Sequence, residues 1–162
     1  MSAMQHTRRI AVVLVAAATV VALATVAASA ASGEQAKPAA LTVFIPGEPP
    51  PGLPREGAQI LTVDPVLDPD SGAEIGTAIT RVVIAEVIDD DAVFILDCTV
   101  RLADGNLNFY GADSFSSLAD GVTYTVIGGT GRYHGTRGIV TVTGGHVDGH
   151  DGSLLAFDLT RR

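Results

Sequence analysis

The chain of 162 residues has no tryptophan and only one cysteine, Cys98. A single cysteine excludes an internal disulfide, so the fold must rest on apolar burial and backbone hydrogen bonds. Basic residues are also scarce: 10 Lys and Arg stand against 18 Asp and Glu, which gives a net charge of −8. Nucleic acid and anionic lipid bind clustered Lys and Arg, so this composition excludes both as expected partners. Strong helical periodicity is missing as well, and β-branched Val, Ile and Thr dominate the ordered stretches.

The first 30 residues have the pattern of a cleavable secretion signal. Arg8 and Arg9 precede a stretch without any charge, and an A-x-A sequence ends at Ala30. We therefore expect cleavage after Ala30, an extracellular product and a net charge that goes from −8 to −10 once both arginines are removed. The apolar run approaches the roughly 20 residues that span a bilayer, so an uncleaved anchor is the alternative. The paired arginines leave Sec and twin-arginine export both open.

Residues 31–39 are small and polar, which predicts a flexible lead-in, and residues 40–162 suffice for one domain. Turn-forming clusters divide this domain into short β-rich segments, with a proline-rich loop at residues 46–54. No helical crossover separates them, so neighbours should pair antiparallel. The sequence predicts an all-β, eight-stranded antiparallel up-and-down β-barrel, with a β-sandwich as the alternative. The strands are expected at residues 40–45, 59–66, 75–88, 92–102, 107–115, 122–127, 137–143 and 154–160.

The fourth predicted strand shows how the faces should be arranged. Its even-numbered residues, including Cys98, are apolar, whereas Asp97 lies on the opposite, more polar face. If the preceding turn centres on residues 89–90, Arg81 lies opposite Cys98 on the apolar face and Asp97 lies opposite Val82. Cys98 is expected to be an inert, buried thiol, and a reactive or intermolecular cysteine is the alternative.

Three acidic or histidine-containing segments contain residue types that bind metal ions. His146 and His150 lie in one polar turn, and Asp68 and Asp89 begin clusters of acidic residues. On a strand or turn, the four-residue spacing of the two histidines does not bring both rings together, and neither acidic cluster has the full spacing of oxygen ligands that calcium requires. The preference of Asp, Ser and Gly for turns accounts for the acidic clusters more simply. No phosphate-binding loop is expected either, because no Lys-Ser/Thr pair follows the glycine turn. We therefore predict neither a metal nor a cofactor.

The most distinctive segment is residues 126–140, VIGGTGRYHGTRGIV, preceded by NLNFYG at residues 106–111. Both segments resemble the dirigent proteins and the related allene oxide cyclase barrels, and the resemblance extends over residues 40–160. In the turn, Gly128, Gly129 and Gly131 would permit positive φ. Plant dirigent proteins have an acidic residue at the end of the first strand. This chain departs from that pattern, because the corresponding segment is FIPGE at residues 44–48 and its acid, Glu48, lies in the proline-rich loop.

The resemblance implies an isomerase-like or dirigent-like activity without a cofactor: a small apolar molecule is bound and its cyclisation or stereoselective coupling is steered. Arg137 occupies the position of the pocket-lining arginine, so the resemblance implies a catalytic role in which its guanidinium binds a developing oxyanion. Tyr133, Arg81 and Asp97 are the candidate binding residues. The alternative is a non-catalytic secreted carrier or structural module. Self-association into a homo-oligomer is left open.

Overall fold

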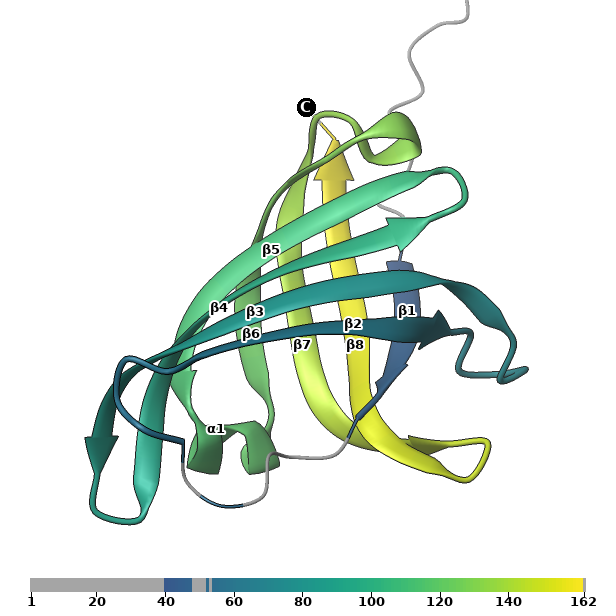
Figure 1. Ribbon diagram of the computed structural model, residues 1–162. Helices are drawn as coiled ribbons and strands as arrows, with labels where there is room; N and C mark the ends of the chain where they lie inside the picture. Colours follow the sequence, from purple (N-terminus) through teal and green to yellow (C-terminus); the bar gives the residue numbers. More distant parts are fainter. Residues whose placement is uncertain (1–39, 48–51, 53, 162) are drawn as a thin grey trace, which may run out of the picture. The chain divides into compact units, whose positions relative to one another are not determined.

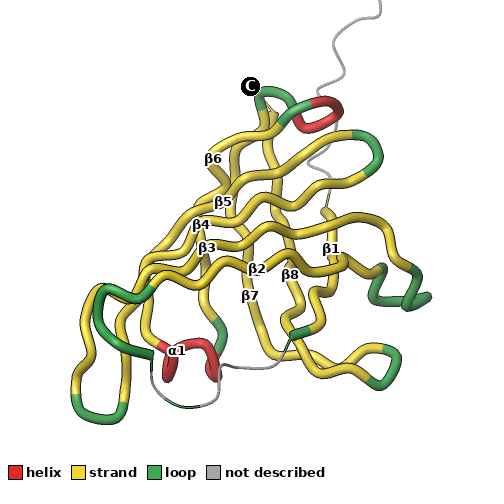
Figure 2. Tube along the Cα trace, viewed as in Figure 1, coloured by secondary structure: helices red, strands yellow, loops and turns green. Residues whose placement is uncertain are grey.

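The computed structural model describes residues 40–47, 52 and 54–161, which contain all eight predicted strands (Figures 1 and 2). The predicted secretion signal, the lead-in and Glu48 lie outside these residues. No helix in the described part of the chain is long and apolar enough to cross a membrane. The elements are β1 (Ala40–Pro46), β2 (Gln59–Leu67), β3 (Glu74–Ile88), β4 (Asp91–Leu102), β5 (Gly105–Ser114), α1 (Phe115–Asp120), β6 (Val122–Gly129), the 3-10 helix η1 (Gly131–Tyr133), β7 (Thr136–Val147) and β8 (His150–Arg161).

The strands pair antiparallel in chain order, and β8 pairs with β1 to close a barrel. The closure is uneven. The β1–β8 ladder contains seven residue pairs, whereas β1 and β2 pair only at Phe44 and Leu67. The predicted up-and-down barrel is therefore confirmed and the sandwich alternative is wrong. Most of the β2 edge that faces β1 lacks a ladder partner among the described residues.

A β-bulge in β3 changes the predicted register of the β3–β4 hairpin. Ala85 has no partner on β4, so every pair beyond it shifts by one residue. Arg81 lies opposite Asp97 rather than Cys98, and Val82 lies opposite Leu96 rather than Asp97. A shift of one residue moves a side chain to the other face of the sheet. The predicted position of Arg81 on the apolar face is therefore wrong.

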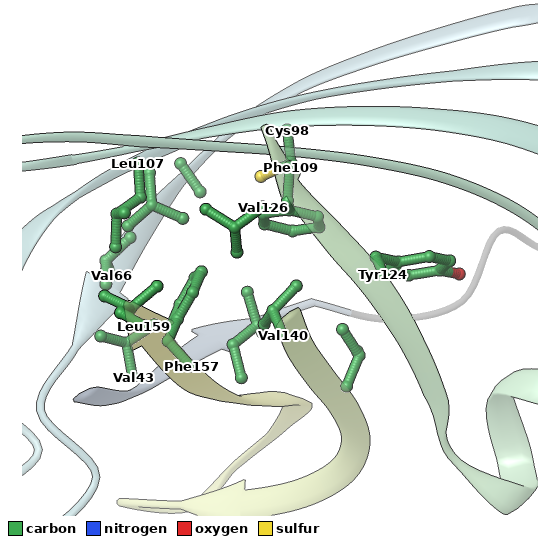
Figure 3. Packing of buried hydrophobic residues seen from close by; sticks show 14 of the residues in the cluster. Val43, Val66, Cys98, Leu107, Phe109, Tyr124, Val126, Val140, Phe157 and Leu159 are labelled. Atoms are coloured by element: carbon green, nitrogen blue, oxygen red, sulfur yellow. The ribbon is translucent and has the colours of Figure 1, made fainter. Parts of the chain in front are cut away.

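Side chains alternate between the inside and the outside of the barrel as the sequence predicted for β4. Phe94, Cys98 and Val100 are buried, whereas Ile95 and Arg101 are exposed. The inner faces of the strands form a continuous apolar core (Figure 3). Its most completely buried members, at 0% exposure, are Val43, Val66, Ala78, Val100, Leu107, Val126 and Val140.

The two short helices lie at opposite ends of the barrel (Figure 1). Sequence analysis missed α1, whose first residue was assigned to the fifth strand. The helix begins where the Ser114 hydroxyl accepts a hydrogen bond from the backbone N–H of Ser117, and ends at Gly121, whose φ is 89°. Asp91 at the start of β4 accepts hydrogen bonds from the hydroxyl and the N–H of Ser116, which fasten α1 to the wall.

β2 extends one residue beyond the predicted range 59–66, to Leu67, and Pro65 is tolerated within it because the edge toward β1 is largely unpaired among the described residues. The long polar turn predicted at residues 144–152 is a tight turn at Asp148 and Gly149, because the β7–β8 ladder extends almost to the tip.

Candidate functional site

The lumen, defined as the space enclosed by the inward-facing side chains of the eight strands, is apolar with a few polar exceptions. Strand alternation and pairing place Thr62, Asp64, Thr80 and Cys98 on the inner faces of β2, β3 and β4. Tyr124 of β6 is buried in the core cluster. Asp113 of β5 pairs with Phe94, whose ring is buried, so it shares the inner face.

Cys98 is the buried thiol that the sequence predicted. Its side chain is 4% exposed, and its sulfur lies 3.3 Å from the Thr80 hydroxyl, which donates a hydrogen bond to it. Burial raises the pKa of the thiol to about 11, and the carboxylates of Asp97 and Asp64 contribute in the same direction. Because the thiolate is the nucleophilic form, Cys98 is unsuited to covalent catalysis.

Tyr124 is an inward-facing polar residue whose ring is tightly packed. Its ring lies parallel to that of Phe109, with 6.1 Å between ring centroids, and against the backbone of Gly111. A Cβ atom at Gly111 would collide with this ring, so glycine is required there for packing. The ladder between β5 and β6 contains a β-bulge at Ile127 of β6, which has no partner on β5.

The hydroxyl of Tyr124 is buried and has no hydrogen-bond partner among the residues that the structure describes. Burial raises the pKa of this phenol to about 12, with a smaller contribution from the negative charge of Asp113. The group therefore stays protonated at physiological pH and remains a hydrogen-bond donor. Sequence analysis did not include Tyr124 among the candidate site residues, because no pattern in a sequence indicates an unpaired hydroxyl.

The inner wall is unevenly covered. On β7 and β8, the inward-facing Val140 and Phe157 are 0% and 3% exposed. On the opposite wall, Ile60 of β2, Val82 of β3 and Leu96 of β4 face inward yet remain only half-buried. This wall adjoins the largely unpaired edge of β2. The inner wall is therefore less completely covered on β2, β3 and β4 than on β7 and β8.

Arg81 and Asp97, both predicted as binding residues, meet on the outer face of the barrel. The Nε atom of Arg81 lies 2.8 Å from the Oδ2 atom of Asp97, and both side chains are substantially exposed. The sequence placed Asp97 on the correct face and Arg81 on the wrong one. An exposed ion pair of this kind contributes about 0–1 kcal/mol to stability.

Arg137 also lies on the outer face, where β7 follows the glycine turn. Its side chain is exposed, and Nη1 donates hydrogen bonds to the carbonyl oxygens of Ile127 and, at 3.1 Å, of Thr136. The position expected for Arg137 inside the pocket is therefore wrong. Its guanidinium joins the ends of β6 and β7, and its catalytic role stays a prediction.

Tyr133, in η1, packs against the core at the barrel end opposite α1 and is 7% exposed (Figure 1). Burial is the main cause that raises the pKa of its phenol, and Asp104 adds to the effect. Tyr133 and Tyr124 contribute to the same core cluster, whereas Arg81, Asp97 and Arg137 lie outside the wall.

The glycine turn at residues 128–131, which carries the family resemblance, is bonded through its backbone to the β4–β5 turn. The N–H of Thr130 donates to the carbonyl of Asn106 and that of Arg132 to the carbonyl of Asp104, at 2.9 and 2.8 Å. Of the three glycines expected to have positive φ, only Gly131 does, at 58°. The turn thereby fastens the β6–β7 connection onto the β4–β5 hairpin.

The histidine-containing and acidic segments behave as turns. His146 Nδ1 lies 2.8 Å from Oδ1 of Asp151 in an exposed pair near the β7–β8 tip. Asp68 accepts hydrogen bonds from Asp70 and Ser71, and these bonds lower the pKa of its carboxyl group. Among the residues that the structure describes, no three side chains of the metal-ligating types come together.

No family model and no curated protein sequence matches the chain. Solved structures do match. A pyocyanin demethylase has a TM-score of 0.60 and 19% identity, over 75% of this chain and 100% of that one. A pterocarpan synthase dirigent protein has a TM-score of 0.59 and 17% identity, over 80% and 99%. A Diels-Alderase from Streptomyces koyangensis has a TM-score of 0.60 and 21% identity, over 82% and 72%.

At identities of 17–21%, these similarities concern the fold. They confirm at that level the resemblance first noticed in the glycine turn and in the strand before it. The chain has the barrel fold that dirigent proteins share with cyclase-like barrels.

Proposed function

We propose that the barrel binds a small, mainly apolar molecule in its lumen and steers the cyclisation or coupling of that molecule. The observation that carries the proposal is an apolar inner wall with a buried, unpartnered donor, the Tyr124 hydroxyl. Small-molecule sites commonly combine apolar walls with a few placed polar groups. Structures named as a Diels-Alderase and as a dirigent protein share the fold, which supports this class of reaction.

Catalysis of this kind needs no covalent intermediate. A wall that holds a reactive guest in one folded conformation removes the entropy cost of reaching the transition state and selects one stereochemical outcome. Asp64 and Asp113, both on the inner face, make the lumen unfavourable for an anion. The otherwise apolar wall penalises any charged group through desolvation, so the guest is expected to be uncharged.

The test is native mass spectrometry of the protein purified from its own producing cells, followed by denaturation and analysis of the released small molecules. We expect one predominant neutral compound in stoichiometric amount. Protein that carries no compound, and that also fails to take up a panel of neutral apolar molecules, would contradict the proposal.

A non-catalytic carrier is the alternative function, favoured by the half-buried inner wall beside the largely unpaired edge of β2. Cyclisation leaves the mass unchanged, so the two functions are separated by chiral chromatography of the guest before and after incubation with the protein. An enzyme converts the guest into one new stereoisomer with repeated turnover. A carrier returns the same compound.

A catalytic contribution of Arg137 is tested in the same assay. Arg137→Ala should alter the stereochemical outcome if the guanidinium reaches the reacting molecule, whereas Arg101→Ala, an exposed arginine of β4, serves as the control. Unchanged chirality and rate in Arg137→Ala would limit that residue to joining β6 and β7.

We also propose that the protein acts outside the cytoplasm. Arg8, Arg9 and the A-x-A sequence ending at Ala30 support export with cleavage. N-terminal sequencing of protein from the culture medium should begin shortly after Ala30. An intact N-terminus in the membrane fraction would favour the anchored form instead.

A further inference from the structure

The Tyr124 hydroxyl is a buried hydrogen-bond donor for which the described residues offer no acceptor. The residue is 4% exposed, and in the described part of the chain the hydroxyl itself has no hydrogen-bond partner. Such groups are rare, since an unsatisfied buried donor carries an appreciable free-energy cost. The rest of the side chain is well accommodated, because the ring lies parallel to that of Phe109 and rests against Gly111. The packing thus holds the ring, and its hydroxyl points away from the other labelled core side chains (Figure 3).

Tyr124 lies beside the part of the inner wall, on β2–β5, that is only half-buried. Pairing places Ile60, Val82, Leu96 and Gly111 in one row across β2, β3, β4 and β5, and Tyr124 of β6 follows next to Gly111. The first four residues are half-buried although the row faces inward. A guest that entered from the β2 side would lie along apolar side chains and reach the phenol at the end of the row.

The charges around the phenol restrict the chemistry of that guest. Asp113 lies on the inner face of the neighbouring strand and acts electrostatically on Tyr124. A carboxylate there disfavours an anionic ligand and leaves the phenol protonated as a donor. The complementary group is a neutral oxygen acceptor, such as a carbonyl or an ether, on an otherwise apolar molecule.

We propose that the Tyr124 hydroxyl donates a hydrogen bond to a carbonyl or ether oxygen of a neutral guest that lies along the inner wall of β2–β5. This inference rests on the proposed guest binding and adds to it the polar anchor and the class of ligand. Tyr124 acts here as a binding residue that fixes the orientation of the guest.

The first test uses the free protein. Tyr124→Phe removes only the unpartnered oxygen, so thermal unfolding followed by circular dichroism should show a midpoint about 3–6 °C higher than that of the wild type. The matched control is Tyr110→Phe on the outer face of β5, where the side chain is 47% exposed and the midpoint should not move. A lower or unchanged midpoint for Tyr124→Phe would mean that the hydroxyl is already satisfied, and would overturn the proposal.

The second test uses two fluorescent probes. Prodan is a neutral naphthalene with a ketone, and dimethylaminonaphthalene has the same ring system without it. The chain contains no tryptophan, so tryptophan emission does not overlap the probe signal. Tyr124→Phe should weaken prodan binding about tenfold, which corresponds to one hydrogen bond, and should change the affinity for the ketone-free probe by less than about twofold.

The outcomes separate this inference from the proposal on which it rests. If both probes bind wild type and Tyr124→Phe equally well, the lumen binds guests but the hydrogen bond is refuted. If the variant weakens both probes equally, ring packing rather than the hydroxyl is responsible, which also refutes the inference. If neither probe binds the wild type, both the inference and the proposed guest binding fail.

Discussion

Substitution of Gly111 by alanine should disrupt the packing that holds Tyr124. A Cβ atom at this position would lie 2.6 Å from Cε1 of the Tyr124 ring and closer still to Cδ1. Ordinary carbon contacts require about 3.5 Å or more, so the ring must move by roughly 1 Å or more. Overpacking of this kind costs about 1–3 kcal/mol, and the displaced ring also loses part of its contact with Phe109. Alanine regains about 0.5–1 kcal/mol of backbone entropy in a strand.

The lost ring contact, worth about 0.5–1.5 kcal/mol, offsets the regained backbone entropy. The net expectation therefore remains a loss of about 1–3 kcal/mol, which lowers the thermal midpoint by roughly 4–15 °C. Urea unfolding followed by far-ultraviolet circular dichroism gives the free energy of unfolding directly. Gly144→Ala is the matched control, because Gly144 is also a β-strand glycine but a Cβ atom there would meet nothing within 4 Å. That variant should be neutral or slightly more stable than the wild type.

A double-mutant cycle with Tyr124→Ala identifies the cause. Without the ring, Gly111→Ala should cost almost nothing, so the coupling energy should be about 1–3 kcal/mol. The reasoning is refuted if Gly111→Ala behaves like Gly144→Ala, or if its full cost persists in the Tyr124→Ala background.

Three further predictions concern groups away from that contact. Arg81→Ala should change stability by less than about 1 kcal/mol and leave probe affinity unaltered, because its ion pair with Asp97 is exposed on the outer wall; weaker probe binding would contradict this assignment. Cys98 should resist Ellman's reagent at pH 8 until the protein unfolds, since burial raises its pKa to about 11, and rapid labelling of folded protein would disprove the inert assignment. Hydrogen bonds from Ser116 and a neighbouring backbone N–H lower the pKa of Asp91 to about 2, so its stabilising contribution is present above pH 4 and is lost as the pH falls toward 2. Acid unfolding of Asp91→Asn should lack this contribution and should resemble the wild type only at the lowest pH; identical curves throughout would show that the bonds to α1 contribute nothing.

The sequence predicted the eight strands and the barrel because its strongest signals are local. Alternation along residues 92–102 identified the inner face of β4, and clusters of Asp and Gly marked the hairpin turns. The helix α1 left a weaker signal. Ser114 and Gly121 are reasonable cap residues, yet six residues are too few for a helical period to appear.

The candidate site was less predictable because it depends on register. The bulge at Ala85 has no glycine or proline to mark it, yet it moves Arg81 from the inner face to the outer one. Arg137 was placed by resemblance alone, and its face depends on how the strand continues after η1. The importance of Tyr124 depends on the atoms that surround its hydroxyl, and sequence spacing carries no information about an unsatisfied hydrogen bond.

The uneven closure of the barrel also bears on how the chain folds. Because β1 pairs along its whole length with β8 and at one position with β2, the first strand obtains most of its hydrogen bonds from the last. These contacts span more than a hundred residues, and such long-range pairing slows folding. During synthesis, β1 therefore cannot form its main ladder until β8 has been made, and until then its unpaired edges are exposed to aggregation.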